Sequence, residues 1–269
     1  MAHPYFDAPR PAVFGHRGAS GELPENTLAA FERALSQGAD YLETDIHRTR
    51  CGRIVVSHDG DVSRMTDGHG QIAELSFAEL RDLDAGHGFT PDGGRSFPER
   101  GRGHRMPLLE EVFEAFPEAR INLELKATDP ALAHDTLAMI RRHGREDRTL
   151  VAGAEDETLA ILRSAIARTG ISPAVGASVG DVLAFVRSAL AHEAPPPGPM
   201  ALQVPPDFSG AALVTPAFVA HAHAHGLFVH VWTVNNEARM RDLLDLGVDA
   251  VMSDFPARLR AVVDAWPGA

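Results

Sequence analysis

Residues 227–253, LFVHVWTVNNEARMRDLLDLGVDAVMS, contain the pattern that decides the fold. The run LFVHVWT is rich in the β-branched and aromatic residues of strands, and EARMRDLLDL has helical periodicity with Asn236 as its start signal. Gly247 follows this helical segment, and DAVMS at 249–253 predicts a second strand. A strand, a helix and a strand in this order are typical of a βαβ unit, which builds a parallel sheet.

The same alternation covers nearly the whole chain. Eight runs predict strands, at 12–15, 41–47, 121–125, 149–152, 174–177, 200–204, 227–233 and 249–253. Helical patterns occupy 26–37, 76–84, 108–116, 131–143, 156–169, 180–192, 215–225, 236–246 and 256–265. Eight strands are the number in a (β/α)8 TIM barrel, and 269 residues suit one such barrel. We therefore expect an α/β fold with a single domain over residues 12–265.

One short segment interrupts the alternation. RIVVSH at 53–58 follows the second strand too closely for a right-handed crossover, so we expect the two to form an antiparallel hairpin. A turn centred just after Cys51 places Asp45 opposite His58. In the alternative arrangement this segment is itself a barrel strand, and the run at 200–204 is not.

A long segment at 59–107 also interrupts the pattern. It is rich in glycine, aspartate and arginine, and its one clear helix is SFAELRDLD at 76–84. A connection of this length inside a barrel is usually functional. We expect it to cap the C-terminal face of the barrel.

The composition excludes several classes of partner. The 37 acidic and 25 basic residues give a net charge of −12, which disfavours nucleic acids and anionic membranes because both attract basic proteins. Cys51 is the only cysteine, so no internal disulfide can form. The first residues lack a signal-peptide pattern, and no run reaches the roughly 18 apolar residues of a membrane span. We expect a cytoplasmic protein without stable membrane association.

Three carboxylates stand on predicted strands, whose ends carry function in barrels. Glu43 and Asp45 are two residues apart and share a strand face, and Glu124 lies on the third strand. Inside a barrel these groups would repel one another unless a cation lay between them, and hard oxygen ligands indicate Mg²⁺ or Ca²⁺. The alternative is that they face outward and pair with arginines. The residues at positions 42, 46, 123 and 125 lie on the opposite face of the same strands and are apolar. An outward-facing position of the carboxylates is therefore less favourable, because it would turn these apolar residues toward the barrel interior.

Two histidines and the only lysine lie near these carboxylates. His16 and His58 end strands, and the imidazole pKa of about 6.5 suits general acid and base catalysis. The HAHAH run at 221–225 lies in a helical pattern, and we interpret it as a solvated helix end. Lys126 is the one lysine in a chain with 24 arginines, and it shares a strand face with Glu124. A lysine kept in such a composition indicates a position that needs a compact ammonium group.

Taken in order, these motifs resemble the glycerophosphodiester phosphodiesterases over roughly residues 12–260. The matching elements are His-Arg-Gly, Glu-x-Asp, His-Asp, Glu-x-Lys and Trp-Thr-Val-Asn, within the stretches 14–68, 106–117, 121–127 and 229–256. The resemblance implies metal-dependent hydrolysis of a glycerophosphodiester to sn-glycerol 3-phosphate and an alcohol. Thr44, Ser57 and Leu108 depart from residues that are common in the family, and none of the three is a candidate site residue.

The resemblance also implies a role for each candidate residue. The metal ligands are Glu43, Asp45 and Glu124, the catalytic histidines are His16 and His58, and the phosphate and substrate contacts are Arg17, Lys126 and Trp232. In the mechanism that we hypothesise, the metal polarises a phosphate oxygen and the two cations stabilise transition-state charge. One histidine deprotonates the nucleophile and the other protonates the leaving alcohol. The nucleophile is either water or the glycerol 2-hydroxyl. Trp232 forms a wall for the glycerol carbons, unless it belongs to the barrel core.

Other functions fit the sequence less well. A lysophospholipase D or a sphingomyelinase-D-like enzyme on the same barrel would need an apolar trough for acyl chains. The segment 85–105 is polar and arginine-rich instead, and we find no apolar stretch for membrane docking. A barrel that only binds phosphorylated ligands would be expected to have lost one of the two histidines or three carboxylates. All five residues are present in this sequence, which disfavours a binding protein without activity. A nuclease is disfavoured by the negative net charge.

Overall fold

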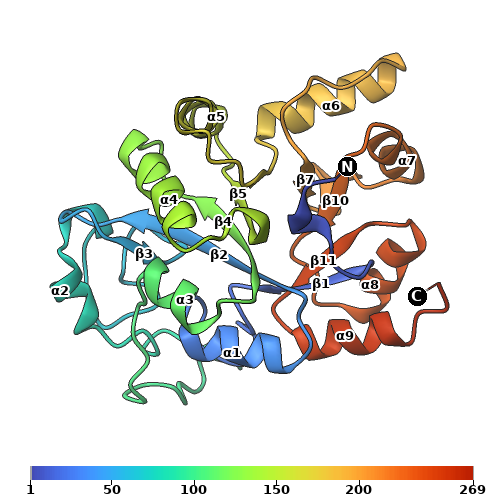
Figure 1. Cartoon of the computed structure of the whole chain (residues 1–269). Helices are drawn as coiled ribbons and strands as arrows, with labels where there is room; N and C mark the ends of the chain where they lie inside the picture. Colours follow the sequence, from blue (N-terminus) through green and yellow to red (C-terminus); the bar gives the residue numbers. More distant parts are fainter. Residues whose placement is uncertain (1, 269) are drawn as a thin grey trace.

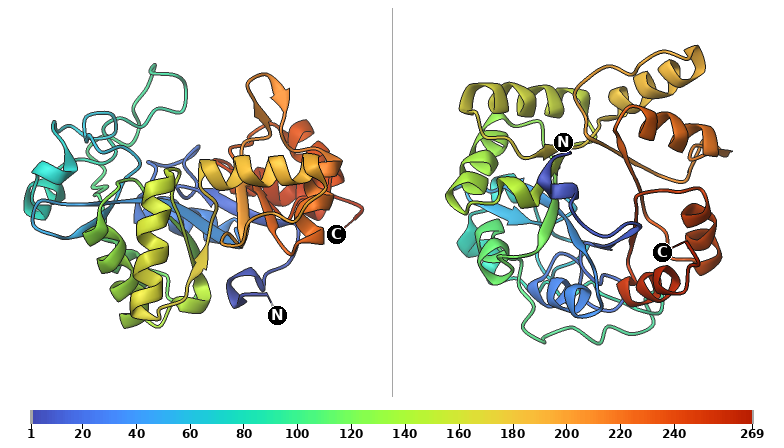
Figure 2. Two further views of the ribbon diagram at one scale, coloured as in Figure 1. Left: turned by 90° about the horizontal axis from the view of Figure 1, so that it is seen from above. Right: turned by 45° about the vertical axis from the view of Figure 1, so that its right-hand side comes forward.

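The computed structural model describes residues 2–268 and shows an α/β barrel (Figure 1). Eight of its strands are parallel neighbours in the spatial order β6, β5, β4, β2, β1, β11, β10 and β7. A bridge between Gly176 and Ala201 joins the two ends of this sheet, so the barrel is nearly closed. The helices surround the strands, as the right view of Figure 2 shows. The predicted TIM barrel is confirmed.

Each predicted strand and helix has a counterpart in the structure. The barrel strands are β1 (Ala12–His16), β2 (Tyr41–Arg48), β4 (Arg120–Leu125), β5 (Thr149–Ala152), β6 (Ala174–Val175), β7 (Ala201–Val204), β10 (Phe228–Val231) and β11 (Ala250–Ser253). The α-helices are α1 (Leu28–Ser36), α2 (Phe77–Arg81), α3 (Leu109–Ala115), α4 (Pro130–Arg142), α5 (Asp156–Thr169), α6 (Val179–Ala191), α7 (Pro216–Ala224), α8 (Glu237–Asp245) and α9 (Pro256–Asp264). The remaining elements are the strands β3 (Ile54–Val56), β8 (Asp207–Phe208) and β9 (Ala211–Ala212), and the 3₁₀ helices η1 (Pro4–Phe6), η2 (Ile72–Glu74) and η3 (Glu146–Arg148).

Local signals in the sequence fix the helix ends. The side chains of Thr27 and Asn236 accept hydrogen bonds from the first backbone N–H groups of α1 and α8. Gly170 ends α5 with a φ of 66°, a left-handed conformation that glycine adopts without steric cost. These signals define the starts of α1 and α8 and the end of α5.

Strand β3 pairs with β2 in the expected antiparallel sense, but the predicted register is wrong by one residue. The Ser57 N–H donates to the Asp45 carbonyl at 3.0 Å, so Asp45 lies opposite Ser57 and not opposite His58. The turn has three residues because Thr49 pairs with Arg53: the Thr49 N–H donates to the Arg53 carbonyl, and the Arg53 N–H donates to the Thr49 hydroxyl, both at 2.9 Å. Since β3 lies off the barrel path, β7 keeps its place as a barrel strand.

The barrel interior is apolar at its N-terminal end. There the rings of Phe14 and Tyr41 stack with centroids 4.4 Å apart, and Tyr5 and Phe6 of η1 pack beneath them in one buried cluster. The left view of Figure 2 shows the N-terminus on the side opposite the projecting loops of the insertion and of β8–β9. The larger part of the core lies between strands and helices, and it contains the outward-facing Leu42, Ile46, Leu123 and Leu125.

The segment 59–107 packs on β3 rather than inside the barrel. Its small core contains Val62, Ile72, Leu80 and Met106, together with Val55 of β3. The hairpin β8–β9, which was not predicted, follows β7 and stands at the same end of the barrel. Among the described residues, no helix is both long enough and apolar enough to cross a membrane.

Candidate active site

A cavity of about 540 Å³ opens at the C-terminal ends of the barrel strands. All eight candidate residues line it: His16, Arg17, Glu43, Asp45, His58, Glu124, Lys126 and Trp232. They lie on β1, β2 and β4 or just after β1, β3, β4 and β10, and these strands are far apart in the sequence. Because parallel strands end at the same face of a barrel, the fold gathers their last residues around one opening.

The three carboxylates form one cluster. Oxygen atoms of Glu43, Asp45 and Glu124 lie within 4.8 Å of one another, since β2 and β4 pair in parallel with Asp45 opposite Glu124. Glu43 and Asp45 are buried, and Glu124 is half-buried. Burial and the negative charge of Asp45 raise the pKa of Glu43 to about 8, because both disfavour its charged form. A divalent cation bound between the three groups would relieve this repulsion.

Lys126 contacts the same cluster. Its Nζ lies 3.1 Å from Glu124 Oε1 and 3.3 Å from Asp45 Oδ1. Burial alone would lower the pKa of Lys126, but the charges of the two carboxylates raise it above its ordinary value. The ammonium therefore stays charged at the cavity wall, where an anionic group of a ligand can reach it.

Arg17 follows β1 in a left-handed backbone conformation with a φ of 54°. Its backbone N–H donates to Glu43 Oε2 at 3.1 Å, and its guanidinium donates to Glu25 Oε1 at 3.1 Å and lies 3.5 Å from Asp45 Oδ2. Gly18 lets the chain turn here, since a Cβ at that position would lie 2.6 Å from the backbone of α1. The His-Arg-Gly motif thus places a cation beside the carboxylate cluster.

The ring of His16 lies between two carboxylates. Its Nδ1 is 2.7 Å from Asp254 Oδ1, and its Nε2 is 3.9 Å from Glu43 Oε2. Burial alone would lower the pKa of His16, but the bond to Asp254 and the charge of Glu43 raise it above its ordinary value. His16 can therefore carry a proton at the cavity.

His58 has a different environment. Its Nδ1 lies 2.7 Å from Asp59 Oδ1, and Asp59 also forms an ion pair with Arg64. Arg64 in turn donates to Glu25 Oε1 at 2.6 Å, which links the start of the insertion to the partner of Arg17. The His58 carbonyl lies 3.2 Å from His47 Nε2. The loop that carries His58 is thus bound to the barrel through charged side chains.

The other half of the cavity is apolar. It is lined by residues of α6 and of the loop around β8–β9: Val179, Val182, Leu183, Val186, Phe208 and Leu213. Three of them remain well exposed, Val179 at 58%, Leu183 at 46% and Phe208 at 61%. An apolar wall therefore does adjoin the site, and it comes from α6 and the loop around β8–β9 rather than from the polar segment 85–105. Trp232 is 41% exposed at this cavity, which removes the interpretation as barrel core.

Sequence reasoning missed several polar residues at the site. Gln203 of β7 donates to Asn122 at 2.9 Å inside the cavity, and Asn26 donates to Asp45 Oδ2 at 3.1 Å. A signal existed for Asn122, which stands two residues before Glu124 on the same strand face. None existed for Asn26, whose contact with Asp45 depends on how the loop before α1 folds over β2.

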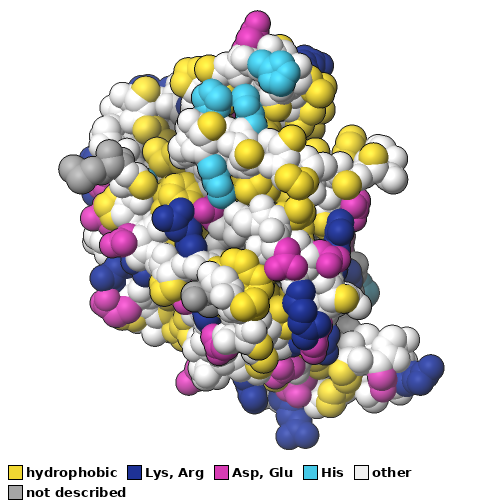
Figure 3. Space-filling model, turned by 90° about the vertical axis from the view of Figure 1, so that its right-hand side faces the viewer, with side chains coloured by type: hydrophobic (Ala, Val, Ile, Leu, Met, Phe, Trp, Pro, Cys, Tyr) yellow, Lys and Arg dark blue, Asp and Glu magenta, His cyan; other side chains and the backbone are white. Residues whose placement is uncertain are grey.

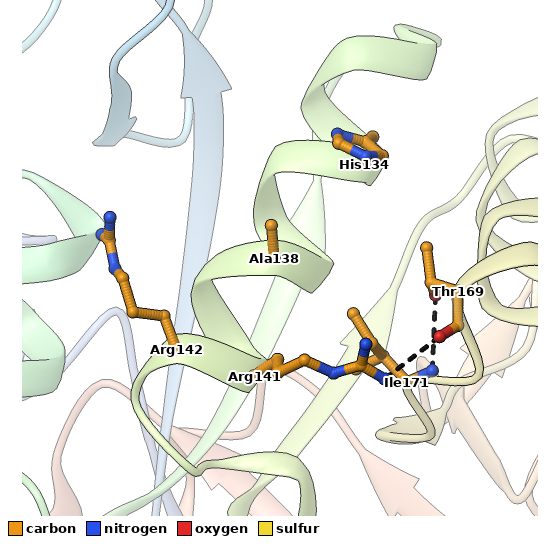
Figure 4. A pocket seen from close by; sticks show the side chains of 6 residues that line it. All are labelled: His134, Ala138, Arg141, Arg142, Thr169 and Ile171. Carbon is orange, nitrogen blue, oxygen red and sulfur yellow. Dashed lines mark hydrogen bonds between the residues drawn. The ribbon is translucent and has the colours of Figure 1, made fainter.

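Charged and histidine side chains also cluster outside this cavity, where most of them bind one another. A pocket of about 460 Å³ beside α4 includes Arg141 and Arg142 (Figure 4). These two arginines form ion pairs with Glu146 and Glu110. Histidine side chains gather over α7 (Figure 3), where the rings of the i, i+4 pair His221 and His225 lie 4.6 Å apart. His223 is bound to Asp249 at 2.9 Å. A second acid and histidine group, Glu110, Glu114 and His143, includes the partner of Arg142.

Comparisons with known proteins point to one family. Residues 16–258 match the model of the glycerophosphoryl diester phosphodiesterase family. A glycerophosphodiester phosphodiesterase of Bacillus altitudinis is 32% identical, over 91% of this chain and 95% of the relative. Human lysophospholipase D GDPD1 is 31% identical, over 91% of this chain and 83% of the relative.

Solved structures agree as well. A phosphodiesterase of Oleispira antarctica, solved in complex with the product sn-glycerol 3-phosphate, superposes with a TM-score of 0.75. It is 30% identical, and the match covers 95% of this chain and 98% of that chain. Fold and sequence thus point to the same group of proteins.

Proposed function

The chain belongs to the glycerophosphoryl diester phosphodiesterase family, and on that premise we propose that it hydrolyses glycerophosphodiesters to sn-glycerol 3-phosphate and an alcohol. One observation carries the proposal for the site. A single cavity holds three clustered carboxylates, two histidines and two cations, at the end of the barrel where such enzymes act. The product bound to the Oleispira antarctica phosphodiesterase supports the same reaction.

Glu43, Asp45 and Glu124 would hold a divalent cation. Their crowded oxygens and the raised pKa of Glu43 fit such an ion, and an all-carboxylate set favours Mg²⁺ or Ca²⁺. When bound, the ion would supply Lewis acidity to a phosphate oxygen.

The chain's own residues would then divide the remaining work. Arg17 and Lys126 bind the phosphate and oppose the negative charge that grows on it in the transition state. Of His16 and His58, one takes the proton of the nucleophile and the other gives a proton to the leaving oxygen. Trp232 offers a flat apolar surface to the glycerol carbons.

The test measures release of glycerol 3-phosphate from glycerophosphocholine and glycerophosphoethanolamine, before and after exhaustive chelation. We expect chelation to reduce turnover strongly, because it removes the Lewis acid. His16→Ala and His58→Ala should each reduce turnover by at least about a hundredfold, the usual scale for loss of a general acid or base. His134→Ala, an exposed histidine on α4, serves as the control. Unchanged activity after chelation would contradict the metal, and unchanged activity in either histidine variant would contradict its catalytic role.

A second candidate function is hydrolysis of lysophospholipids, and the apolar half of the cavity favours it. A small, polar glycerophosphodiester leaves the wall of α6 in contact with water, whereas an acyl chain would cover it. Each methylene group that leaves water contributes up to about 0.8 kcal/mol to binding. The wall lies across the barrel from the carboxylates, beside Trp232, so a chain attached to the glycerol would extend along it.

Leu183 and Leu190 give this candidate a matched test. Both are exposed leucines of α6, at 46% and 79%, but only Leu183 lines the cavity. We expect Leu183→Asp to reduce kcat/KM for lysophosphatidylcholine by at least about tenfold, the equivalent of 1.4 kcal/mol, and to spare glycerophosphocholine. Leu190→Asp should spare both substrates. Equal losses on both substrates in Leu183→Asp would contradict the acyl-chain role and leave the phosphodiesterase proposal intact.

The extent of the functional unit is also a proposal. We propose that residues 12–265 act as one domain, with 59–107 as its cap, and that the protein works in the cytoplasm. The bonds of Arg64 to Asp59 and Glu25 support the cap, because they join this segment to the cavity rim. A single cooperative unfolding transition of the full chain and cell fractionation are the corresponding tests.

A further inference from the structure

The ring of His16 is hydrogen-bonded to Asp254, a residue near the C-terminal end of the sequence. Asp254 follows β11, and its Oδ1 lies 2.7 Å from His16 Nδ1. The opposite ring nitrogen, Nε2, lies 3.4 Å from Thr233 Oγ1 and 3.9 Å from Glu43 Oε2, on the side of the carboxylate cluster. Nδ1 of His16 is therefore bound to Asp254, and Nε2 is directed toward the carboxylate cluster.

Asp254 is itself fixed on both oxygens. Ser20 Oγ lies 2.9 Å from Oδ1, and the Asn235 side chain donates to Oδ2 at 2.6 Å. Asn235 also accepts a hydrogen bond from the Asp254 backbone N–H at 3.0 Å and one from the Ser253 hydroxyl at 2.9 Å. The carboxylate therefore cannot rotate without breaking several bonds.

The partner of His58 lacks this fixation by neutral groups. Asp59 is adjacent to His58 in the sequence, lies on a loop, and shares its charge with Arg64, whose side chain is 46% exposed. Asp254, in contrast, has neutral donors as its other partners and stands at the end of a barrel strand. The orientation of the His16 ring is therefore more strongly constrained than that of the His58 ring.

We propose that Asp254 is a positioning residue for His16, with Ser20 and Asn235 holding its carboxylate in place. A neutral imidazole has two tautomers, and a carboxylate at Nδ1 selects the one that carries its proton there. Nε2 is then presented to the substrate in a single orientation. This inference rests on the proposed catalytic role of His16 and adds to it a residue for which no role has been assigned.

The test is a double-mutant cycle on glycerophosphocholine hydrolysis. We expect Asp254→Asn to reduce kcat by about 10–100-fold, the range for lost orienting partners, with little change in KM. In the His16→Ala background the same substitution should cost nothing further, whereas in the His58→Ala background its cost should remain in full. A merely structural role would reduce activity equally in both backgrounds.

A matched control is available at the other end of the same strand. Asp249 binds His223 at 2.9 Å, is buried, and lies away from the cavity, so Asp249→Asn should leave kcat unchanged. If Asp254→Asn does not fold, Ser20→Ala is a milder change, which removes the contacts of Ser20 Oγ with Asp254 Oδ1 at 2.9 Å and with the His16 carbonyl at 2.7 Å. It should reduce kcat about threefold, a loss within the range of the net free energy of one hydrogen bond.

Two different failures can be told apart. Unchanged kcat in Asp254→Asn, or in Ser20→Ala where that variant decides, overturns the positioning role. So does an equal loss with and without His16. Full activity of His16→Ala itself would instead overturn the catalytic assignment on which this inference rests.

Discussion

At the scale of single residues, the structure explains why the one lysine of this arginine-rich chain stands at position 126. The only lysine of the chain places its ammonium 3.1 Å from Glu124 and 3.3 Å from Asp45. An ammonium is a compact point charge, whereas a guanidinium is a planar fork that would need more room between these carboxylates.

We therefore expect Lys126→Arg to lose activity although it keeps the charge. Its kcat/KM on glycerophosphocholine should fall at least about tenfold, and Lys126→Ala should fall further, since a hydrogen bond to a charged group contributes about 1.5–3 kcal/mol. Steady-state kinetics of the two variants decide the matter. An arginine variant as active as wild type would show that charge alone is sufficient there.

At the scale of elements, the N-terminal η1 closes the barrel opposite the cavity. Tyr5 is fully buried against Phe6 and Tyr41, with ring centroids about 5 Å away, and the Tyr41 hydroxyl donates to the Tyr5 carbonyl at 2.9 Å. The hydroxyl of Tyr5 has no hydrogen-bond partner among the described residues. This element stabilises the fold through the Tyr5 ring and gains nothing from its oxygen.

Tyr5→Phe and Tyr5→Ala should consequently act in opposite directions. Removing the unpaired hydroxyl should raise the free energy of unfolding by about 1 kcal/mol, within the range for a buried unsatisfied group. Removing the ring should lower it by about 3–5 kcal/mol, as for other aromatic-to-alanine changes in cores. Denaturant unfolding measures both. A destabilised Tyr5→Phe would reveal a partner for the hydroxyl, such as a buried water.

The elements themselves were largely predictable, because local signals fix them. The side chains of Thr27 and Asn236 start helices, and a glycine such as Gly170 ends one. The β2–β3 register was not predictable, since the hydrogen bonds of Thr49 decide between a two-residue and a three-residue turn. The hairpin β8–β9 was missed because each of its strands has only two residues.

At the scale of the whole molecule, metal binding should stabilise the fold. A ligand that binds only the folded state adds about 2.7 kcal/mol at a hundred times its dissociation constant. Mg²⁺ or Ca²⁺ should thus raise the melting temperature of chelator-treated protein. Glu124→Gln should remove this increase and still fold, because Glu124 is 28% exposed. The same increase in wild type and in Glu124→Gln would place the binding ion elsewhere.

Acid should destabilise the protein through His230. Its ring lies inside the barrel near Phe14, with centroids 5.1 Å apart, and burial lowers its pKa to about 4. Below pH 6.5 the unfolded chain binds a proton at this site and the folded chain does not, so stability falls as the pH drops from about 6.5 to about 4. The loss over this window is about 3 kcal/mol at 1.36 kcal/mol per pKa unit.

Unfolding curves of wild type and His230→Leu between pH 4 and pH 7.5 test this account. The variant should lose most of that pH dependence, whereas His134→Leu, at an exposed position on α4, should keep it. Parallel curves for wild type and His230→Leu would contradict the role of His230.

The sequence by itself determined the barrel and the charged half of the candidate site. Strand and helix periods are local properties, and the two-residue spacings of Glu43 with Asp45 and of Glu124 with Lys126 put each pair on one face before any tertiary contact is known. Only the tertiary structure decided what surrounds these groups. Asp254 meets His16 and α6 forms an apolar wall because closing the barrel brings distant strand ends together, and no local pattern encodes those distances.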